Sequence, residues 1–292
     1  MNVILTGATG WLGSAILSQL AQLDCIEKII AFSGKTDIEK LDKIDKIIFF
    51  KPTEVNTRLA FEKAKSDCTV IHCATVYDRN DQDAMQSFLC NEVFAIKILD
   101  AGAKSNIQSF INIDSFFTKA ADDATSMMSY IISKDNFKKW GKVYSEKHGV
   151  KFINASIFHV YGKNDDDKKF LPWVLNKLAN NETIVLQNPN SRRDFVFKED
   201  AVEAIKKILL SQNKINESYS QFDIGCGYLN SVLEVVQILK KELNSKSHIE
   251  YDADSEPNDT YFEIKAQIEP MAKLGWYPRY SVRKGLKKWC DE

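Results

Sequence analysis

Short runs of β-branched and aliphatic residues recur along the first half of the chain, separated by longer stretches whose apolar residues fall three or four positions apart. The runs predict buried strands, and the longer stretches, such as Leu12–Leu23 and Ala84–Ala101, predict helices that cover a sheet face. The expected strands are Val3–Leu5, Lys28–Phe32, Ile47–Phe50, Thr69–Cys73, Ser109–Ile113 and Phe152–Phe158. This alternation predicts an α/β fold, a Rossmann-type doubly wound parallel sheet.

The pattern changes from about residue 165, where the pieces become shorter and more charged. Strand-like segments there are Thr183–Leu186, Phe195–Phe197 and Gln221–Ile224. We therefore expect a larger main domain over residues 1–164, and a smaller α+β lobe that would face a substrate over residues 165–292, with segments that return to the main domain.

Composition excludes several classes of protein. With 44% hydrophobic and 27% charged residues, the chain is typical of a globular protein. A net charge of -1 creates no field that would recruit nucleic acid or an anionic membrane. No apolar run is long enough to span a bilayer, and no basic segment precedes an apolar one at the N-terminus. The six cysteines occur singly without C-x-x-C spacing, which predicts neither a metal site nor disulfides and suits the cytoplasm.

A glycine-rich turn follows the first expected strand and opens the first helix. Gly7 permits the tight turn, Gly10 lets the backbone approach a pyrophosphate, and Gly13 lets the helix lie close to the strand. Free N–H groups at the start of that helix would bind the anion. The turn therefore predicts dinucleotide binding, with cofactor contacts from Gly7, Thr9, Gly10, Trp11, Leu12 and Gly13.

The end of the second strand bears on the choice of dinucleotide. NAD-binding proteins usually carry an acid there for the ribose 2′-hydroxyl, whereas this chain reads Ser33-Gly34-Lys35. Ser33 would donate a hydrogen bond to a 2′-phosphate and Lys35 would supply charge, which favours NADPH over NADH or NAD. Alternatively, Lys35 is a solvated lysine in a lysine-rich loop.

A Tyr-x-x-x-Lys pattern places a phenol and an ammonium group one helical turn apart. It occurs at Tyr130, Tyr261 and Tyr280. Only Tyr130 both follows a strand that ends in a hydroxyl, Ser115, and opens a long helix, Tyr130–Lys147. We expect Lys134 to lower the pKa of the Tyr130 phenol toward the working range.

Further motifs occur in a fixed order along nearly the whole chain. They are the glycine turn, His72-Cys73-Ala74, Asn91, Ile113-Asp114-Ser115, Tyr130–Lys134, Val160-Tyr161-Gly162, Arg193-Asp194-Phe195, Gly225-Cys226-Gly227 and Leu274-Gly275-Trp276. In this order they resemble the extended short-chain dehydrogenase/reductases, the NAD-dependent epimerase/dehydratase family, which act mostly on nucleotide sugars.

The resemblance implies a role for each matching residue. Tyr130 would donate a proton to a carbonyl oxygen, Lys134 would tune Tyr130 and bind the ribose, and Ser115 would hydrogen-bond the oxygen, with Thr118 as the fallback hydroxyl. These roles agree with hydride transfer to a carbonyl carbon, because the oxygen gains negative charge. Further implied cofactor contacts are Cys73, Ala74, Thr75, Asn91, Phe158 and Val160.

The substrate side resembles one branch of that family. Members that eliminate water carry an acidic pair after the strand-end hydroxyl, where this chain has Phe116-Phe117. The segments around Ser115, Tyr130 and Val160 look most like those of nucleotide-sugar 4-ketoreductases that act on CDP- or dTDP-linked 4-keto deoxyhexoses for surface polysaccharides. Substrate contacts would come from Ser115, Phe116, His159 and Arg193.

Some points stay open on the sequence alone. A packed histidine with no ligand is an equal alternative for His159. The alternative for Arg193 is that it belongs to a solvated pair with Arg192. A second family arginine is replaced by Glu256, and Arg279 is a candidate substitute.

Two other functions are compatible with these motifs. One is a nucleotide-sugar 4-epimerase that keeps NAD tightly bound, and the other is a non-catalytic NAD(P)-sensing protein. The helices Ala84–Ala101 and Tyr130–Lys147 resemble the pair through which the family dimerises, which implies a homodimer.

Overall fold

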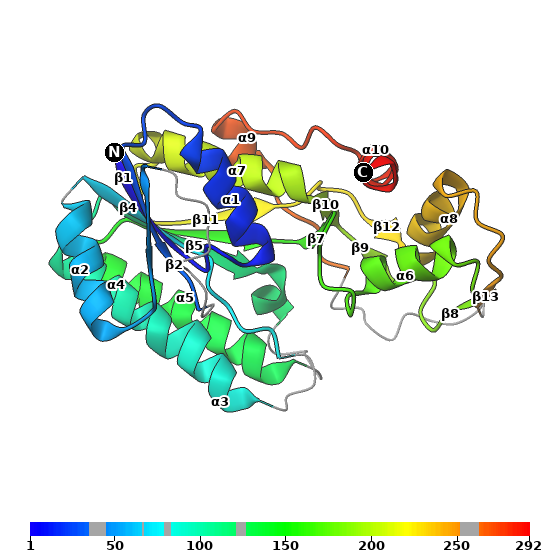
Figure 1. The fold of residues 1–292 in the computed structure, drawn as a ribbon, viewed down its shortest axis with the longest axis horizontal. Helices are drawn as coiled ribbons and strands as arrows, with labels where there is room; N and C mark the ends of the chain where they lie inside the picture. Colours follow the sequence, from blue (N-terminus) through cyan, green and yellow to red (C-terminus); the bar gives the residue numbers. More distant parts are fainter. Residues whose placement is uncertain (35–44, 66, 79–82, 121–126, 252–262) are drawn as a thin grey trace. The chain divides into compact units, whose positions relative to one another are not determined.

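Seven strands form one parallel sheet in the computed structural model, which describes residues 1–34, 45–65, 67–78, 83–120, 127–251 and 263–292. The strand order is β11-β6-β5-β4-β1-β2-β3 (Figure 1). The predicted doubly wound α/β fold is thereby confirmed. The strands are β1 (Asn2–Thr6), β2 (Lys28–Phe32), β3 (Ile47–Phe50), β4 (Cys68–His72), β5 (Ser109–Ser115), β6 (Phe152–Ile157) and β11 (Tyr219–Ile224).

Helices cover both faces of the sheet, with α2, α4 and α5 on one face and α1 on the other (Figure 1). Their buried residues recur three or four positions apart, as in Ile16, Leu17 and Leu20 of α1, so each helix turns one apolar stripe to the strands. The helical segments of this region are α1 (Trp11–Ala21), α2 (Glu54–Ala64), α3 (Ala84–Ser87), the π-helical η2 (Phe88–Phe94), α4 (Ala95–Lys104), the 3₁₀ turn η3 (Phe116–Ala120) and α5 (Met128–His148).

Aromatic rings fill the core between α5 and the centre of the sheet. Phe110 of β5 stacks on Phe152 of β6 at 5.4 Å between ring centroids, and Phe137 of α5 meets both rings edge-on. These buried rings belong to one apolar cluster with residues of β1, β2, β4, α2 and α4. The cluster fixes α5, and therefore the side chains that α5 carries, against β5.

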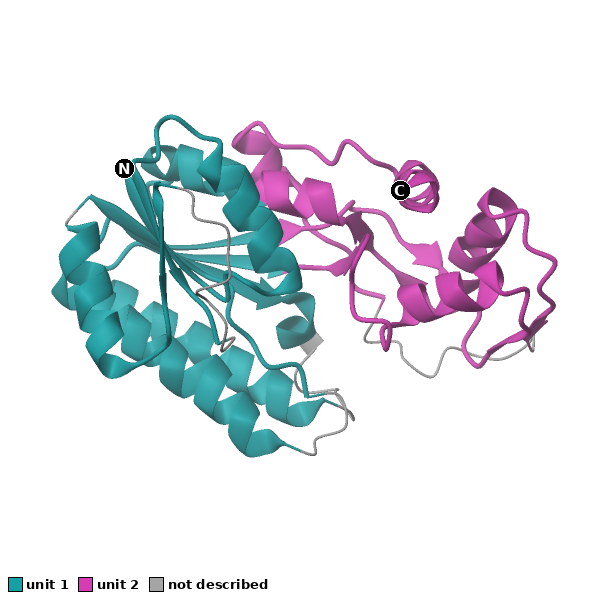
Figure 2. Ribbon diagram, in the orientation of Figure 1, with its two compact units in different colours: residues 1–156, 205–222 teal, residues 157–204, 223–292 magenta. Residues whose placement is uncertain are grey.

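The chain divides into two compact units (Figure 2): unit 1 comprises residues 1–156 and 205–222, and unit 2 comprises 157–204 and 223–292. The division falls after Ser156 rather than at 164/165, because the chain leaves the main sheet as β6 ends. The segment Gln221–Ile224, expected in the C-terminal lobe, instead lies within β11 at the sheet edge. That a separate unit binds the substrate stays a prediction.

Unit 2 contains three short strand pairs: β7 with β10, β9 with β12, and β8 with β13. Its apolar core gathers residues of β8, β10, α6, α8 and α10 around Tyr161. The strands are β7 (His159–Tyr161), β8 (Ile184–Leu186), β9 (Arg192–Arg193), β10 (Phe195–Phe197), β12 (Asn230–Ser231) and β13 (Ile249–Tyr251). The remaining helices are α6 (Phe170–Ala179), α7 (Lys198–Ser211, which continues into unit 1), η4 (Gln212–Lys214, in unit 1), α8 (Val232–Glu242), α9 (Glu269–Lys273) and α10 (Val282–Asp291).

The described residues contain neither a helix suited to spanning a membrane nor a group of side chains suited to a metal ion. None of their helices combines the length and apolar character that crossing a bilayer requires. They also contain no group of His, Cys, Asp and Glu side chains that could hold a metal ion.

We predict that Gly141→Ala lowers the free energy of unfolding by about 2 kcal/mol, because overpacking outweighs the gain in helix propensity. A Cβ atom at Gly141 of α5 would lie 2.3 Å from the Phe152 ring. Gly34→Ala is the control, since an added Cβ there meets nothing within 4 Å. Urea unfolding measures both; equal midpoints for the two variants would contradict the close packing of α5 on β6.

Candidate functional site

The carboxyl ends of β1 and β4 meet where the sheet reverses its direction of winding. β1 pairs with β2 on one side and with β4 on the other. The Thr6 hydroxyl joins the two strand ends: it lies 2.9 Å from Nδ1 of His72 and accepts hydrogen bonds from the backbone N–H groups of Cys73 and Ala74, both at 3.1 Å. Open α/β sheets bind their ligands in the crevice at such a reversal point.

The glycine-rich turn forms a cradle that larger residues would fill. A Cβ atom at Gly13 would lie 2.0 Å from the Gly7 carbonyl oxygen, and one at Gly7, where φ is +66°, would lie 2.7 Å from the Ala74 nitrogen. Gly10 caps α1 without a side-chain hydrogen bond, so no side chain at that cap competes for the first N–H groups of the helix. This geometry fits a dinucleotide, whose pyrophosphate such N–H groups bind.

Two of the predicted cofactor contacts hydrogen-bond each other. The hydroxyl oxygens of Thr9 and Ser33 lie 2.7 Å apart, and Ser33 is buried at the end of β2. Trp11 and Leu12 are half-buried in the first turn of α1. Lys35 lies outside the described residues, as do Glu256 and Tyr261.

Ser115, Tyr130 and Lys134 come together in unit 1. Ser115 ends β5, while Tyr130 and Lys134 lie one turn apart near the start of α5. The side chains of Tyr130 and Ser115 are hydrogen-bonded to each other. The Lys134 ammonium group donates a 2.6 Å hydrogen bond to the backbone carbonyl of Ile113. A phenol, a hydroxyl and an ammonium group therefore converge at the carboxyl end of β5.

The fallback hydroxyl, Thr118, is directed into the protein. Its Oγ1 donates to the Asp114 carboxylate at 3.0 Å and lies 2.9 Å from the Ser115 carbonyl oxygen. Because the Thr118 hydroxyl donates its proton to Asp114, Ser115 is the better candidate of the two buried hydroxyls.

The pKa of Tyr130 is raised rather than lowered, which contradicts the sequence-based expectation. Burial is the main cause: the residue is 5% exposed and loses the water that would solvate a phenolate. The neighbouring Tyr77 phenol and the Asp114 carboxylate raise the pKa of Tyr130 further, while the hydrogen bond with Ser115 lowers it. Lys134 is not among the groups that shift the pKa of Tyr130, and its ammonium group is bonded to the Ile113 carbonyl. The phenol is consequently protonated at neutral pH.

Lys134 itself is 3% exposed, and burial lowers its pKa because a desolvated ammonium group is costly. The nearby Asp114 carboxylate opposes this shift. Burial also raises the pKa of the Cys73 thiol to about 11 and lowers that of His72 to about 3, so both are neutral at pH 7.

Asn91 holds the site together through its side chain. Its Oδ1 accepts hydrogen bonds from the Val76 backbone and the Thr75 hydroxyl, and its Nδ2 donates to the Val76 carbonyl and the Ser133 hydroxyl. These bonds use the whole hydrogen-bonding capacity of the amide. The expected contact between Asn91 and a cofactor stays a prediction. Asn91 fixes the loop after β4 to α5 from within the π-helical η2, a geometry often found at functional sites.

Aromatic rings border Tyr130. The Tyr77 ring lies 4.7 Å from the Tyr130 ring, and the half-buried Phe117 ring lies 6.5 Å away, both edge-to-face. Phe116, the expected substrate contact, is instead buried against Phe117. Of the two phenylalanines, which both belong to η3, Phe117 is the half-buried one and lies beside Tyr130. Sequence reasoning missed Tyr77, because no motif marks its loop.

The remaining predicted contacts lie in unit 2. Phe158 is buried, and its backbone N–H donates to the carbonyl of Ile224; Val160 is half-buried in β7. Burial lowers the pKa of His159, and the positive charge of Arg193 adds to this effect. The backbone N–H of His159 donates to the carbonyl of Asp194, the residue after Arg193, at 3.1 Å. Arg193 also lies over the Phe170 ring at 5.9 Å. The structure therefore brings together the two polar residues expected to contact substrate.

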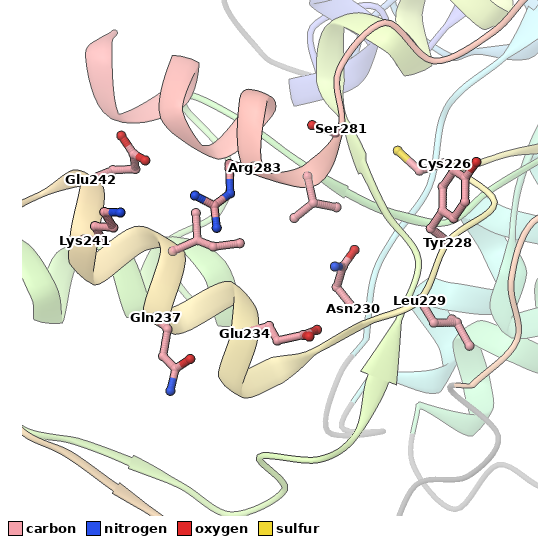
Figure 3. A pocket seen from close by; sticks show the side chains of 12 residues that line it. Cys226, Tyr228, Leu229, Asn230, Glu234, Gln237, Lys241, Glu242, Ser281 and Arg283 are labelled. Atoms are coloured by element: carbon pink, nitrogen blue, oxygen red, sulfur yellow. The ribbon is translucent and has the colours of Figure 1, made fainter.

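A separate cavity of about 630 Å³ opens in unit 2 between α8 and the start of α10 (Figure 3). Glu234, Gln237 and Lys241 of α8 border it opposite Arg283, and Cys226 and Tyr228 lie at its other end. None of the predicted catalytic, cofactor-binding or substrate-binding residues lines this cavity, although Cys226 belongs to the Gly225-Cys226-Gly227 motif.

Known proteins resemble this chain over its whole length. Residues 3–225 match the NAD dependent epimerase/dehydratase family. A CDP-abequose synthase of Salmonella muenchen is 31% identical over 288 residues, which cover 98% of this chain and 96% of that protein. A CDP-abequose synthase of Salmonella typhimurium is 27% identical over 293 residues, with 98% and 96% covered. UDP-glucuronic acid 4-epimerase from Bacillus cereus, solved with UDP-glucuronic acid and NAD, has a TM-score of 0.84 at 17% identity, covering 100% of this chain and 98% of that one, which shows a shared fold.

Proposed function

The chain belongs to the NAD-dependent epimerase/dehydratase family, and on that premise we propose that it reduces the 4-keto group of a nucleotide-linked deoxyhexose. The substrate class rests on the two CDP-abequose synthases that it resembles over nearly its full length. The single observation that carries the reaction is the hydrogen-bonded pair of Ser115 and Tyr130 beside the buried Lys134, at the carboxyl end of β5.

The residues present suit a ketone reduction. When bound, a reduced nicotinamide supplies a hydride to the ketone carbon. Tyr130 donates a proton to the ketone oxygen as that oxygen gains negative charge, and Ser115 donates a hydrogen bond to it. A general acid must enter the reaction protonated, and the Tyr130 phenol is protonated at neutral pH. Lys134 places a positive charge near the oxygen.

Other reactions of the family fit less well. Phe116 and Phe117 occupy the place where dehydrating members carry an acidic pair, so this chain lacks those proton-transferring groups. A 4-epimerase with tightly bound NAD would use the same Ser115, Tyr130 and Lys134, and NAD that copurifies with the protein would favour it. A sensing protein needs none of the three side chains.

We assign binding of the nucleotide diphosphate to Arg193, because a guanidinium group matches phosphate oxygens in shape and charge, and we assign a sugar contact to His159. We further propose a cytoplasmic location, in keeping with six free cysteines.

We propose NADPH as the reductant, because the described residues that follow β2, Ser33 and Gly34, carry no acid. We assign to the Ser33 hydroxyl, which lies 2.7 Å from that of Thr9, a hydrogen bond to the ribose 2′-phosphate.

A homodimer would cover an apolar surface of unit 1. Ile132, Trp140 and Val143 are exposed along one stripe of α5, and Met85, Phe88 and Leu89 are exposed on the neighbouring α3 and η2. The Asn136 amide of α5 hydrogen-bonds Glu92 of η2, so the two helical surfaces adjoin. A contiguous apolar surface on a helix pair suits a symmetric dimer.

The reaction is tested with CDP-, dTDP- and GDP-linked 4-keto deoxysugars and NADPH, by following the absorbance of the reduced cofactor. We expect turnover with at least one substrate and a loss of about 10³-fold in kcat for Tyr130→Phe, the usual contribution of a general acid. Tyr280→Phe is the control, since that tyrosine belongs to unit 2 and hydrogen-bonds Glu199. If no sugar is reduced, or if Tyr130→Phe keeps full activity, the proposal fails.

For the cofactor, we expect Ser33→Asp to reduce the preference for NADPH over NADH at least tenfold, because a carboxylate repels a 2′-phosphate and accepts from a 2′-hydroxyl. Ser33→Ala removes the bond to Thr9 without adding charge and should change the preference much less. The ratio of kcat/KM for the two cofactors measures the effect. A wild-type protein that prefers NADH would refute the NADPH assignment.

For the dimer, Trp140→Lys should convert the protein to monomers, because a buried unpaired charge opposes association. Val55→Lys is the matched control, since Val55 is exposed on α2, away from this surface. Light scattering coupled to gel filtration gives the mass of each. A monomeric wild type, or an unchanged mass for Trp140→Lys, rules out this interface.

A further inference from the structure

Asp114 is a buried carboxylate that the proposed reaction does not use. It is 4% exposed and precedes Ser115 in β5. Its Oδ2 accepts hydrogen bonds from the Thr118 hydroxyl at 3.0 Å and from the Asn154 amide at 2.8 Å. Its Oδ1 is buried and makes no hydrogen bond to any described residue. Such a group is costly unless a nearby positive charge compensates it.

The pleat of the sheet turns Asp114 toward α5. Side chains alternate along a strand, so Phe110, Asn112 and Asp114 share one face of β5. Phe110 contacts Phe137 of α5, which identifies this face as the one that α5 covers. Lys134 lies one turn before Phe137, and its ammonium group bonds the carbonyl of Ile113, the residue next to Asp114.

Other groups near Lys134 carry no negative charge at neutral pH. The groups that act on its ammonium are Asp114 of β5, Cys73 after β4 and Cys90 of η2. Burial raises the pKa of both thiols, that of Cys73 to about 11, and so both stay protonated. His72 of β4, on which Lys134 acts in turn, is neutral because burial lowers its pKa to about 3. Among these groups, Asp114 is the one carboxylate.

We infer that Asp114 is the buried counter-ion of Lys134, a positioning residue that keeps the ammonium charged and the Tyr130 phenol protonated. Asn154 holds the carboxylate in place, and Asn112 in turn donates to Asn154 at 2.7 Å. The catalytic part of this inference rests on the proposed function, whereas the charge pairing does not. Asp114 also acts on Tyr130, whose pKa its negative charge raises.

The sign of the effect on pH dependence follows from these pairings. A negative charge favours the protonated forms of both Lys134 and Tyr130, and the proposed reaction uses both protonated forms. Asp114→Asn keeps the shape of the side chain but removes the charge, so both groups should lose their protons at lower pH. The alkaline limit of activity then moves to lower pH. The groups facing Tyr130 are Tyr77, Ser115, Cys73 and Asp114.

The pairing is tested without any substrate by urea unfolding of the wild type, Asp114→Asn, Lys134→Met and the double variant. Asp114→Asn should lower the midpoint clearly in the wild-type background, because it leaves a buried ammonium unpaired, and much less in the Lys134→Met background. Thr118→Val removes one hydrogen bond to Asp114 but keeps its charge, and should lower the midpoint equally in both backgrounds. Equal losses for Asp114→Asn in both backgrounds would overturn the inference.

Variants that fail to fold also test the pairing of Asp114 with Lys134. If Asp114→Asn fails to fold while the double variant folds, the pairing is supported. If both fail, Asp114→Glu and Asp114→Gln replace them, since they have equal lengths but differ in charge. The inference then requires Asp114→Glu to be the more stable, and it is overturned if the two are equally stable.

The catalytic role is tested by the pH profile of kcat/KM with whichever keto sugar the wild type reduces. The deficit of Asp114→Asn relative to the wild type should grow up to about tenfold per pH unit above its shifted alkaline limit and shrink toward acid pH. A deficit of equal size at every pH would show a merely structural role and overturn the catalytic part. A wild type that reduces no keto sugar would refute the proposed function and leave the unfolding test of the pairing valid.

Discussion

The buried ammonium group of Lys134 is the constraint on which the candidate site depends. A charge removed from water must be met by hydrogen bonds and by opposite charge, and here the Ile113 carbonyl and Asp114 provide them. Both come from the last residues of β5, so α5 has to cross the sheet where β5 ends. The rings of Phe110, Phe137 and Phe152 set the same crossing through apolar packing. Polar and apolar demands thus agree on one position for the helix.

That position determines the state of Tyr130. Tyr130 lies one turn before Lys134, and its ring lies beside those of Tyr77 and Phe117. Burial keeps its phenol protonated. Asn91 holds the Tyr77 loop by fixing Thr75 and Val76 to α5 through Ser133. A protonated phenol hydrogen-bonded to a serine hydroxyl is ready to give a proton, which suits reduction better than a reaction that begins by removing one.

Local sequence patterns were sufficient for the strands β1–β6 of the main sheet and for the glycine turn. The strand ends, the glycine turn and the Tyr130–Lys134 spacing each follow from short-range periodicity, and parallel strands necessarily gather their carboxyl ends at one edge. The sign of the Tyr130 pKa shift could not be predicted from local patterns. It depends on how deeply the ring is buried and on which acceptor the Lys134 ammonium group binds. The position of Tyr219–Ile224 in the main sheet depends on the return of the chain from unit 2, which no local pattern encodes.

Polar residues at inward positions of otherwise apolar strands are a signal that sequence reasoning can use. Asn112 and Asp114 interrupt the buried face of β5, and Asn154 interrupts the neighbouring face of β6. Three such interruptions on adjacent strands can be stable only if they bond one another, as the chain from Asn112 through Asn154 to Asp114 does. A network that ends in a carboxylate still needs a cation. The helix α5, which covers β5, carries the buried Lys134. The sequence of β5 therefore already implies a charged partner on the helix that covers it.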